Sequence, residues 1–254
     1  MDTKGLLIRL RRATREIIGN EPTVAVAYSG GLDSSLIAAM AREFSEVKCY
    51  TCAIEGSFDY RKASEYAAID GADHLIITLP EEALPNWVAK TSKLLASTDP
   101  IRIAYTIPIM CVLEGCREGC LLAGNGADEL FGGYAKYLEA EDPNTMMAAD
   151  LDKMLQEASL MSELATAIGK RIGFPFAAKE VVAFAIQTPL QDKVDGPERK
   201  LILRETARLM GLPSYNRPKK AAQYSSGILK EMKRTARKEG LGLSEWTASV
   251  AHEM

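Results

Sequence analysis

Apolar and polar residues alternate along the first half of the chain in a way that predicts strands and helices in turn. Short apolar runs predict buried parallel strands at 23–28, 47–54, 74–79 and 120–123. Apolar residues three or four positions apart predict helices at 61–70, 82–95 and 108–118, and one with Leu36, Met40 and Phe44 on a single stripe. This alternation predicts an α/β fold, in which a parallel sheet carries helices on both faces.

The pattern changes after about Asp142. Helical periodicity continues and no clear strand follows, with helices predicted at 145–172, 178–185, 198–210 and 226–238. The sequence Asp142-Pro143-Asn144 is typical of a turn and is the best candidate for a boundary. We therefore expect an α/β domain over 1–142 and a C-terminal helical lobe over 143–254 that completes the acceptor site.

Composition and charge narrow the class of protein. The 254 residues are 47% hydrophobic with a net charge of -3, which is typical of a globular protein and argues against a broad nucleic-acid-binding surface. The basic segment Asp2–Asn20 lacks the continuous apolar stretch of a signal peptide, and no run is long enough to cross a membrane, so we expect a cytoplasmic protein. The odd number of cysteines, five, argues against a disulfide framework. We expect them to be buried as small apolar residues rather than to transfer sulfur or bind metal.

A loop between the first predicted strand and the next helix has the composition of an anion-binding site. It consists of Ser29, Gly30, Gly31, Leu32, Asp33, Ser34 and Ser35. Glycines let the backbone approach an anion, and the amides that begin the helix point toward it. The carboxylate of Asp33 would repel phosphate unless a cation lay between them, and Mg²⁺ is commonly held by a carboxylate together with phosphate oxygens.

This loop lacks the Gly-Lys-Ser/Thr ending of a Walker A motif. It closely resembles the SGGxDS pyrophosphate loop of the N-type ATP pyrophosphatases, whose fold is adenine nucleotide alpha hydrolase-like. These enzymes cleave ATP between the α and β phosphates. The resemblance implies that the loop binds ATP through its β and γ phosphates.

A second glycine-rich loop, GNGADELFGGY over 124–134, follows the strand at 120–123. It resembles the SGEGADELFGGY signature of the synthetase domain of asparagine synthetase, a family that also includes the β-lactam and carbapenam synthetases. The resemblance implies that Asp128 binds Mg²⁺ together with Asp33. It also implies that Gly124 and Asn125 adjoin the nucleotide and the acceptor.

Thinner matches extend the resemblance over roughly residues 20 to 230. Ala53 and Ile54 match the strand that contacts adenine, and Asp59 matches an aspartate that follows it. Leu201–Glu205 resembles the KxxLRE helix, and Arg217-Pro218-Lys219 resembles the RxK element. The resemblance implies that Lys219 neutralises charge that builds on the α-phosphate and on the acyl intermediate.

The sequence also departs from this family. Asn125 stands where asparagine synthetase has a glutamate, and an amide cannot accept a proton as a general base. The chain has no cysteine at position 2 and starts almost directly at the synthetase domain, without the family's glutaminase domain. We therefore expect the nitrogen to come from free ammonia, from a separate glutaminase or from an amine on the substrate. These changes leave the residues for ATP intact and put aspartate in doubt as the substrate.

The predicted function is an ATP-dependent ligase that releases AMP and pyrophosphate, activating a small-molecule carboxylate for attack by ammonia or an amine. One alternative is a tRNA-modifying or sulfur-transfer enzyme that uses the same ATP chemistry, although the acidic composition disfavours nucleic acid as a partner. A second alternative is a non-catalytic nucleotide-binding protein. The sequence leaves open the identity of the carboxylate and whether the chain forms a homo-oligomer.

Overall fold

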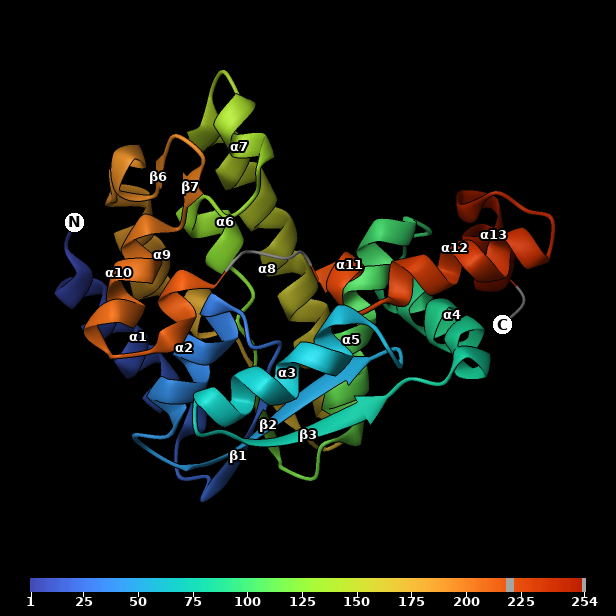
Figure 1. Cartoon of the computed structure of the whole chain (residues 1–254), viewed down its shortest axis with the longest axis horizontal. Coiled ribbons are helices and arrows are strands. Elements are labelled where there is room, and N and C mark those ends of the chain that lie inside the picture. The colour runs from blue at the N-terminus through green and yellow to red at the C-terminus, as the bar shows by residue number, and fades with distance from the viewer. Residues whose placement is uncertain (218–221, 253–254) are drawn as a thin grey trace.

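The computed structural model describes residues 1–217 and 222–252. Its centre is a five-stranded parallel sheet in the order β3-β2-β1-β4-β5 (Figure 1). The strands are β1 (Thr23–Ala27), β2 (Glu46–Ala53), β3 (Asp73–Thr78), β4 (Cys120–Leu122) and β5 (Arg171–Gly173). A separate two-stranded hairpin consists of β6 (Val194–Asp195) and β7 (Glu198–Arg199).

Helices connect and follow the strands. Those of the first half are α1 (Thr3–Ile18), α2 (Leu32–Ala41), α3 (Phe58–Ile69), α4 (Leu84–Leu95), α5 (Pro100–Gly115), α6 (Ala127–Phe131) and α7 (Lys136–Glu139). Those of the second half are α8 (Pro143–Ala167), α9 (Lys179–Gln187), α10 (Leu201–Leu209), α11 (Ala222–Ser225), α12 (Ile228–Lys238) and α13 (Leu243–His252). Short 3₁₀ turns lie between them, among them η4 (Pro213–Asn216).

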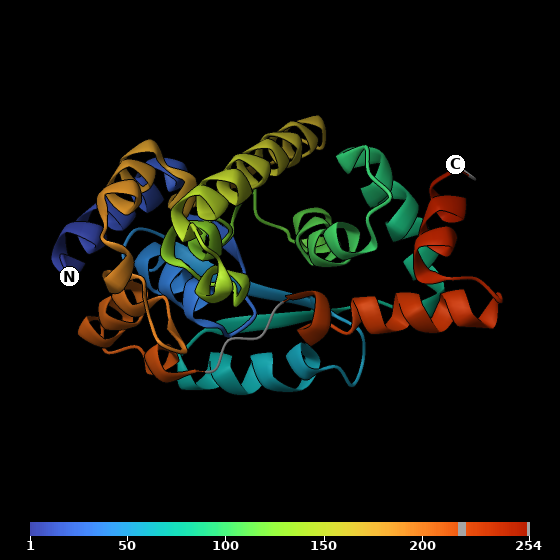
Figure 2. The same cartoon turned by 90° about the horizontal axis from the view of Figure 1, so that it is seen from above.

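Both faces of the sheet are buried, as the alternation of side chains along β1 illustrates. Val24 and Val26 pack into one apolar cluster with residues of α1 and α2, whereas Ala25 packs into another with residues of α4, α5, α12 and α13. Figure 2 views the sheet nearly edge-on, with α3 on one side and α4 and α5 on the other. The predicted parallel sheet with helices on both faces is confirmed.

Three expectations about secondary structure were wrong. The chain beyond residue 142 contributes β5 to the main sheet, paired with β4, so it is not purely helical. Phe44 lies beyond the end of α2 and is 37% exposed, because the helix ends at Ala41. Helix α5 begins at Pro100, capped by Asp99, and accommodates Pro108 within it rather than beginning there. The division at residue 142 stays a prediction.

All five cysteines are buried and free of disulfides, as expected for small apolar residues. Within 1–217 and 222–252, no helix combines the length and apolar character needed to cross a membrane.

Candidate active site

A cavity of about 600 Å³ opens at the carboxyl ends of β1, β2 and β4. Both glycine-rich loops line it, together with residues of α5, α8 and α10. Ligands bind at this edge in open parallel sheets, because the loops that follow the strands converge there. The cavity is large enough for a ligand of drug-like or nucleotide size.

The first loop turns sharply at Gly30, which has a φ of +73°. A Cβ atom at Gly30 would lie 2.5 Å from the ring of Tyr66, so only glycine fits this turn. The loop is tied internally: the amide of Ser29 donates to the hydroxyl of Ser34 at 3.2 Å. Helix α2 begins at Leu32, so its first amides are directed toward the cavity edge.

Arg217 holds this loop from behind. Its guanidinium donates to the carbonyl of Gly30 at 2.7 Å and forms a buried ion pair with Asp70 at 2.7 Å. Asp70 also accepts hydrogen bonds from the hydroxyls of Tyr28 at 2.6 Å and Ser35 at 2.8 Å. The arginine of the RxK element is therefore a fixed structural contact between the C-terminal part of the chain and the phosphate loop.

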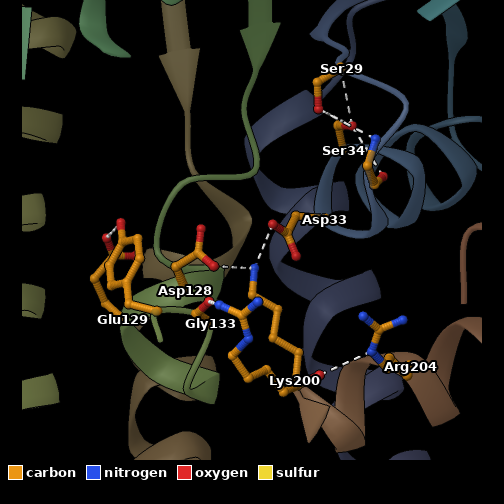
Figure 3. A network of polar contacts seen from close by, with 11 residues as sticks. Ser29, Asp33, Ser34, Asp128, Glu129, Gly133, Lys200 and Arg204 are labelled. Carbon is orange, nitrogen blue, oxygen red and sulfur yellow. Dashed lines mark hydrogen bonds and ion pairs between the residues drawn. The ribbon is translucent and has the colours of Figure 1, made fainter. Parts of the chain in front are cut away.

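The two glycine-rich loops approach each other closely at Gly124. A Cβ atom there would lie 3.1 Å from Cβ of Asp33 and 3.4 Å from the amide nitrogen of Ser34. This close approach brings the carboxylates of Asp33 and Asp128 to opposite sides of one ammonium group, that of Lys200 (Figure 3). Its Nζ lies 2.6 Å from Oδ2 of Asp33 and 2.7 Å from Oδ1 of Asp128.

Lys200 precedes α10 in a left-handed conformation, with a φ of +58°, and its side chain is only 4% exposed. Burial alone would lower the pKa of this lysine, but the carboxylates of Asp128 and Asp33 outweigh it and raise the pKa. Lys200 is therefore charged at every physiological pH. Gly133 packs against this group so tightly that a Cβ atom would lie 1.7 Å from Oδ1 of Asp128.

The second oxygen of Asp33 is available to a cation. Oδ1 is buried and has no hydrogen-bond partner within the described parts of the chain. Such an atom is costly unless a ligand, ion or water satisfies it. With Asp128 on the facing loop, the pair offers the carboxylate oxygens that Mg²⁺ prefers when it also binds phosphate.

Polar side chains of α5, α7 and α8 also line the cavity. Glu157 accepts hydrogen bonds from Arg102 at 2.9 Å and from the hydroxyl of Tyr105 at 2.9 Å. Asp150 accepts from the hydroxyl of Tyr137 at 2.7 Å and pairs with Lys136 at 2.5 Å. These groups offer polar contacts to a substrate beside apolar residues such as Ile109 and Val112.

Glu129 lies next to Asp128 and also lines the cavity. Its carboxylate accepts a hydrogen bond from the hydroxyl of Tyr134 at 2.6 Å. Burial, followed by the charge of Asp128, raises the pKa of Glu129, although the Tyr134 hydrogen bond works in the other direction. Asn125 lines the same cavity.

Most residues predicted from the two loops meet in this cavity. Those that line it are Ser29, Gly31, Leu32, Asp33, Ser34, Gly124, Asn125 and Asp128. Gly30 and Ser35 do not line it, because both are engaged behind the loop with Arg217 and Asp70. Lys219 lies outside the described residues.

The predicted adenine contacts are not at the cavity surface. Ala53 is fully buried, and the amide of Ile54 donates to the carbonyl of Ser226 at 2.9 Å. The C-terminal segment thus covers this end of β2. The residues of β2 that line the cavity are instead Tyr50, Thr51 and Cys52.

Sequence reasoning missed Lys200 and Asp70. Lys200 had a signal, because it opens the KLILRE sequence whose last five residues were matched to a family motif. Asp70 had none, because an aspartate at the end of a helix before a glycine is typical of a cap.

Comparison with known proteins identifies the family of the chain. The family model described as "Asparagine synthase" matches residues 5–172 and 139–241. The chain belongs to the asparagine synthase family. A Methanocaldococcus jannaschii protein assigned as a glutamine-hydrolysing asparagine synthetase is 32% identical over 85% of this chain and 48% of its own length.

More distant matches include the carboxyethyl-arginine beta-lactam-synthase of Streptomyces clavuligerus, 26% identical over 89% of this chain and 45% of its own length. The chain thus spans about half the length of these two curated relatives. Among solved structures, the NMN synthetase of Francisella tularensis aligns over 100% of this chain and 92% of its own, with 11% identity and a TM-score of 0.46.

Proposed function

We propose that this chain binds ATP in the 600 Å³ cavity and uses it to adenylate a small-molecule carboxylate, which ammonia or an amine then converts to an amide. The observation that carries the proposal is the meeting of Asp33 and Asp128 around Lys200, where the two glycine-rich loops approach each other. Membership of the asparagine synthase family supports the same chemistry.

In this proposal the loop over 29–35 binds the β and γ phosphates through its hydroxyls and the first amides of α2. Mg²⁺, held by Asp33 and Asp128, would supply charge neutralisation to the phosphates. The buried charge of Lys200 offsets the two carboxylates, so the phosphate end of the cavity is not strongly negative before ATP arrives.

The first chemical step forms a bond between a carboxylate oxygen of the substrate and the α-phosphorus, while the bond from that phosphorus to the bridging oxygen breaks and pyrophosphate leaves. In the second step the nitrogen attacks the acyl carbon and AMP leaves. We assign Lys219 to neutralise the charge that builds on the α-phosphate, because it matches the lysine of the RxK element.

The presence of asparagine instead of glutamate at position 125 affects the reaction of the nitrogen donor rather than the binding of ATP. An amide side chain orients a substrate through hydrogen bonds but takes no proton. The polar wall that contains Glu157 and Asp150 supports an acceptor with charged groups of its own. The proposal therefore includes amide-forming reactions other than asparagine synthesis.

The test is release of AMP and pyrophosphate from Mg-ATP with a panel of carboxylic acids and ammonium. We expect release that depends on one acid and is lost in Asp33→Ala. The matched control is Asp73→Ala, at the start of β3, where the carboxylate is 56% exposed and contacts Lys48 rather than the cavity. Release of ADP and phosphate instead would refute the proposal. AMP release that required tRNA would favour the RNA-modifying alternative.

A further inference from the structure

A second groove lies on the outer side of the phosphate end of the cavity. It measures about 580 Å³ and is bounded by α10, η4 and the end of the β6–β7 hairpin. Its charged lining consists of Glu198, Arg199, Arg204, Glu205, Arg208 and Arg217. Of the described residues that the sequence predicted as cofactor-binding or catalytic, none lines it.

Three arginines form a wall that the groove shares with the ATP cavity. Arg199, Arg204 and Arg217 line both spaces, so their side chains separate the phosphate end of the cavity from the groove. Figure 3 shows Arg204 below the cluster of Asp33, Asp128 and Lys200. An anion that moved from the cavity toward the groove would meet these guanidinium groups.

Among the described residues, two of these three guanidinium groups have no carboxylate partner. Arg199 donates to the carbonyl of Gly133 at 3.0 Å, and Arg204 donates to the carbonyls of Arg199 at 3.0 Å and Tyr215 at 2.6 Å. Within the described residues, neither arginine forms an ion pair, whereas Arg217 is neutralised by Asp70. Arginine side chains held in place by carbonyls, with their charge unpaired, are well suited to phosphate because their planar donors match its oxygens.

The outer rim of the groove carries a solvent-exposed ion pair. Arg208 pairs with Glu205 at 2.6 Å, but the side chains are 59% and 34% exposed. The pair is bidentate, with Nε and Nη2 of Arg208 2.7 and 2.6 Å from the two carboxylate oxygens of Glu205, and it is open to solvent, so a polyanion can compete with Glu205 for the arginine. The carboxylates of Glu198 and Glu205 reduce the positive charge of the groove without removing it.

From this geometry we infer that the outer groove is a second binding site for pyrophosphate, which takes up the anion as it leaves the ATP cavity through Arg199 and Arg204. The inference rests on the proposed function for the origin of the pyrophosphate. Binding of pyrophosphate to the groove does not depend on the proposed function, because the groove is a separate space. Arg208 lines the groove and does not line the ATP cavity.

The test measures pyrophosphate binding by calorimetry to the full chain saturated with Mg²⁺ and α,β-methylene-ATP, which occupies the cavity and cannot be cleaved between the α and β phosphates. We expect one further equivalent of pyrophosphate to bind. Arg208→Gln should weaken this binding about tenfold, the effect of losing roughly 1.4 kcal/mol, and Arg208→Glu should weaken it further. The control is Arg237→Gln, which removes an exposed arginine on α12, far from α10 (Figure 1).

Loss of all pyrophosphate binding in the presence of the analogue would overturn the inference, as would equal affinity in Arg208→Glu and wild type. If the analogue itself did not bind, the proposed ATP site would fail separately. Pyrophosphate would then be titrated alone. Binding sensitive to Arg208 but not to Arg237 would still support the groove, and binding insensitive to Arg208 would overturn it.

Discussion

Replacing Lys200 with methionine removes the ammonium that Asp33 and Asp128 share, and the geometry gives the size of the effect. The two carboxylate oxygens lie 2.6 and 2.7 Å from Nζ, so they are no more than 5.3 Å apart, the sum of these distances. Two unit charges at that separation repel each other by about 3 kcal/mol at an effective dielectric constant of about 20. We therefore expect Lys200→Met to lower the free energy of unfolding by about 3 kcal/mol, the low end for breaking a buried ion pair.

The low end applies because the carboxylates keep some contact with the cavity, with side-chain exposures of 21% for Asp33 and 19% for Asp128. The assay is urea denaturation at pH 7 in EDTA. Lys153→Met is the matched control, because this lysine also lines the cavity but is 72% exposed and lies 4.0 Å from Asp150. The control should change stability by less than about 1 kcal/mol. A Lys200→Met variant that matched this control would refute the reasoning.

Adding Mg²⁺ extends the same experiment to the proposed metal ligands. An ion that binds only the folded chain stabilises it by RT ln(1 + [ion]/Kd), so tighter binding gives more stabilisation at a given ion concentration. Without the ammonium of Lys200, Asp33 and Asp128 should bind Mg²⁺ more tightly, so Mg²⁺ should stabilise Lys200→Met more than wild type. Equal stabilisation of both proteins would argue against these aspartates as magnesium ligands.

Three further changes have expected outcomes. Burial lowers the pKa of His74, so the folded chain binds fewer protons than the unfolded chain below about pH 6.5. Tm should therefore fall as the pH drops through this value, and His74→Gln should flatten the dependence of Tm on pH. Gly133→Ala would displace the carboxylate of Asp128, and a shift of about 1 Å should reduce AMP release roughly a hundredfold. Arg217→Met would leave Asp70 buried without its partner and should cost about 3–5 kcal/mol in urea denaturation.

The parts of the fold that could be predicted from sequence are those fixed by local signals. Apolar runs of five to eight residues identified β1 and β2, because such strands are buried on both faces. The glycine and serine pattern of the loop over 29–35 identified a turn before a helix, since only glycine accepts the conformation at Gly30. The order of the two loops then predicted that they would meet at one edge of the sheet.

The parts that could not be predicted depend on contacts between distant segments. Strand β5 has three residues, too few for a periodic pattern, and is a strand because it pairs with β4. Ser35 belongs to the loop motif, yet its hydroxyl donates to Asp70 rather than lining the cavity. Ile54 continues the apolar run of β2, but the segment at Ser226 covers it.

The C-terminal part of the chain does more than shape the proposed acceptor pocket, because it also completes the proposed phosphate site. Asp33 and Asp128 come from the first half, and their facing carboxylates repel each other unless a cation lies between them. The structure supplies that cation from Lys200, 167 positions after Asp33. Arg217 likewise reaches Gly30 over 187 positions and fixes the turn of the phosphate loop. A boundary near residue 142 therefore separates two patterns of sequence, but the phosphate end of the cavity depends on both halves for its charge balance and its shape.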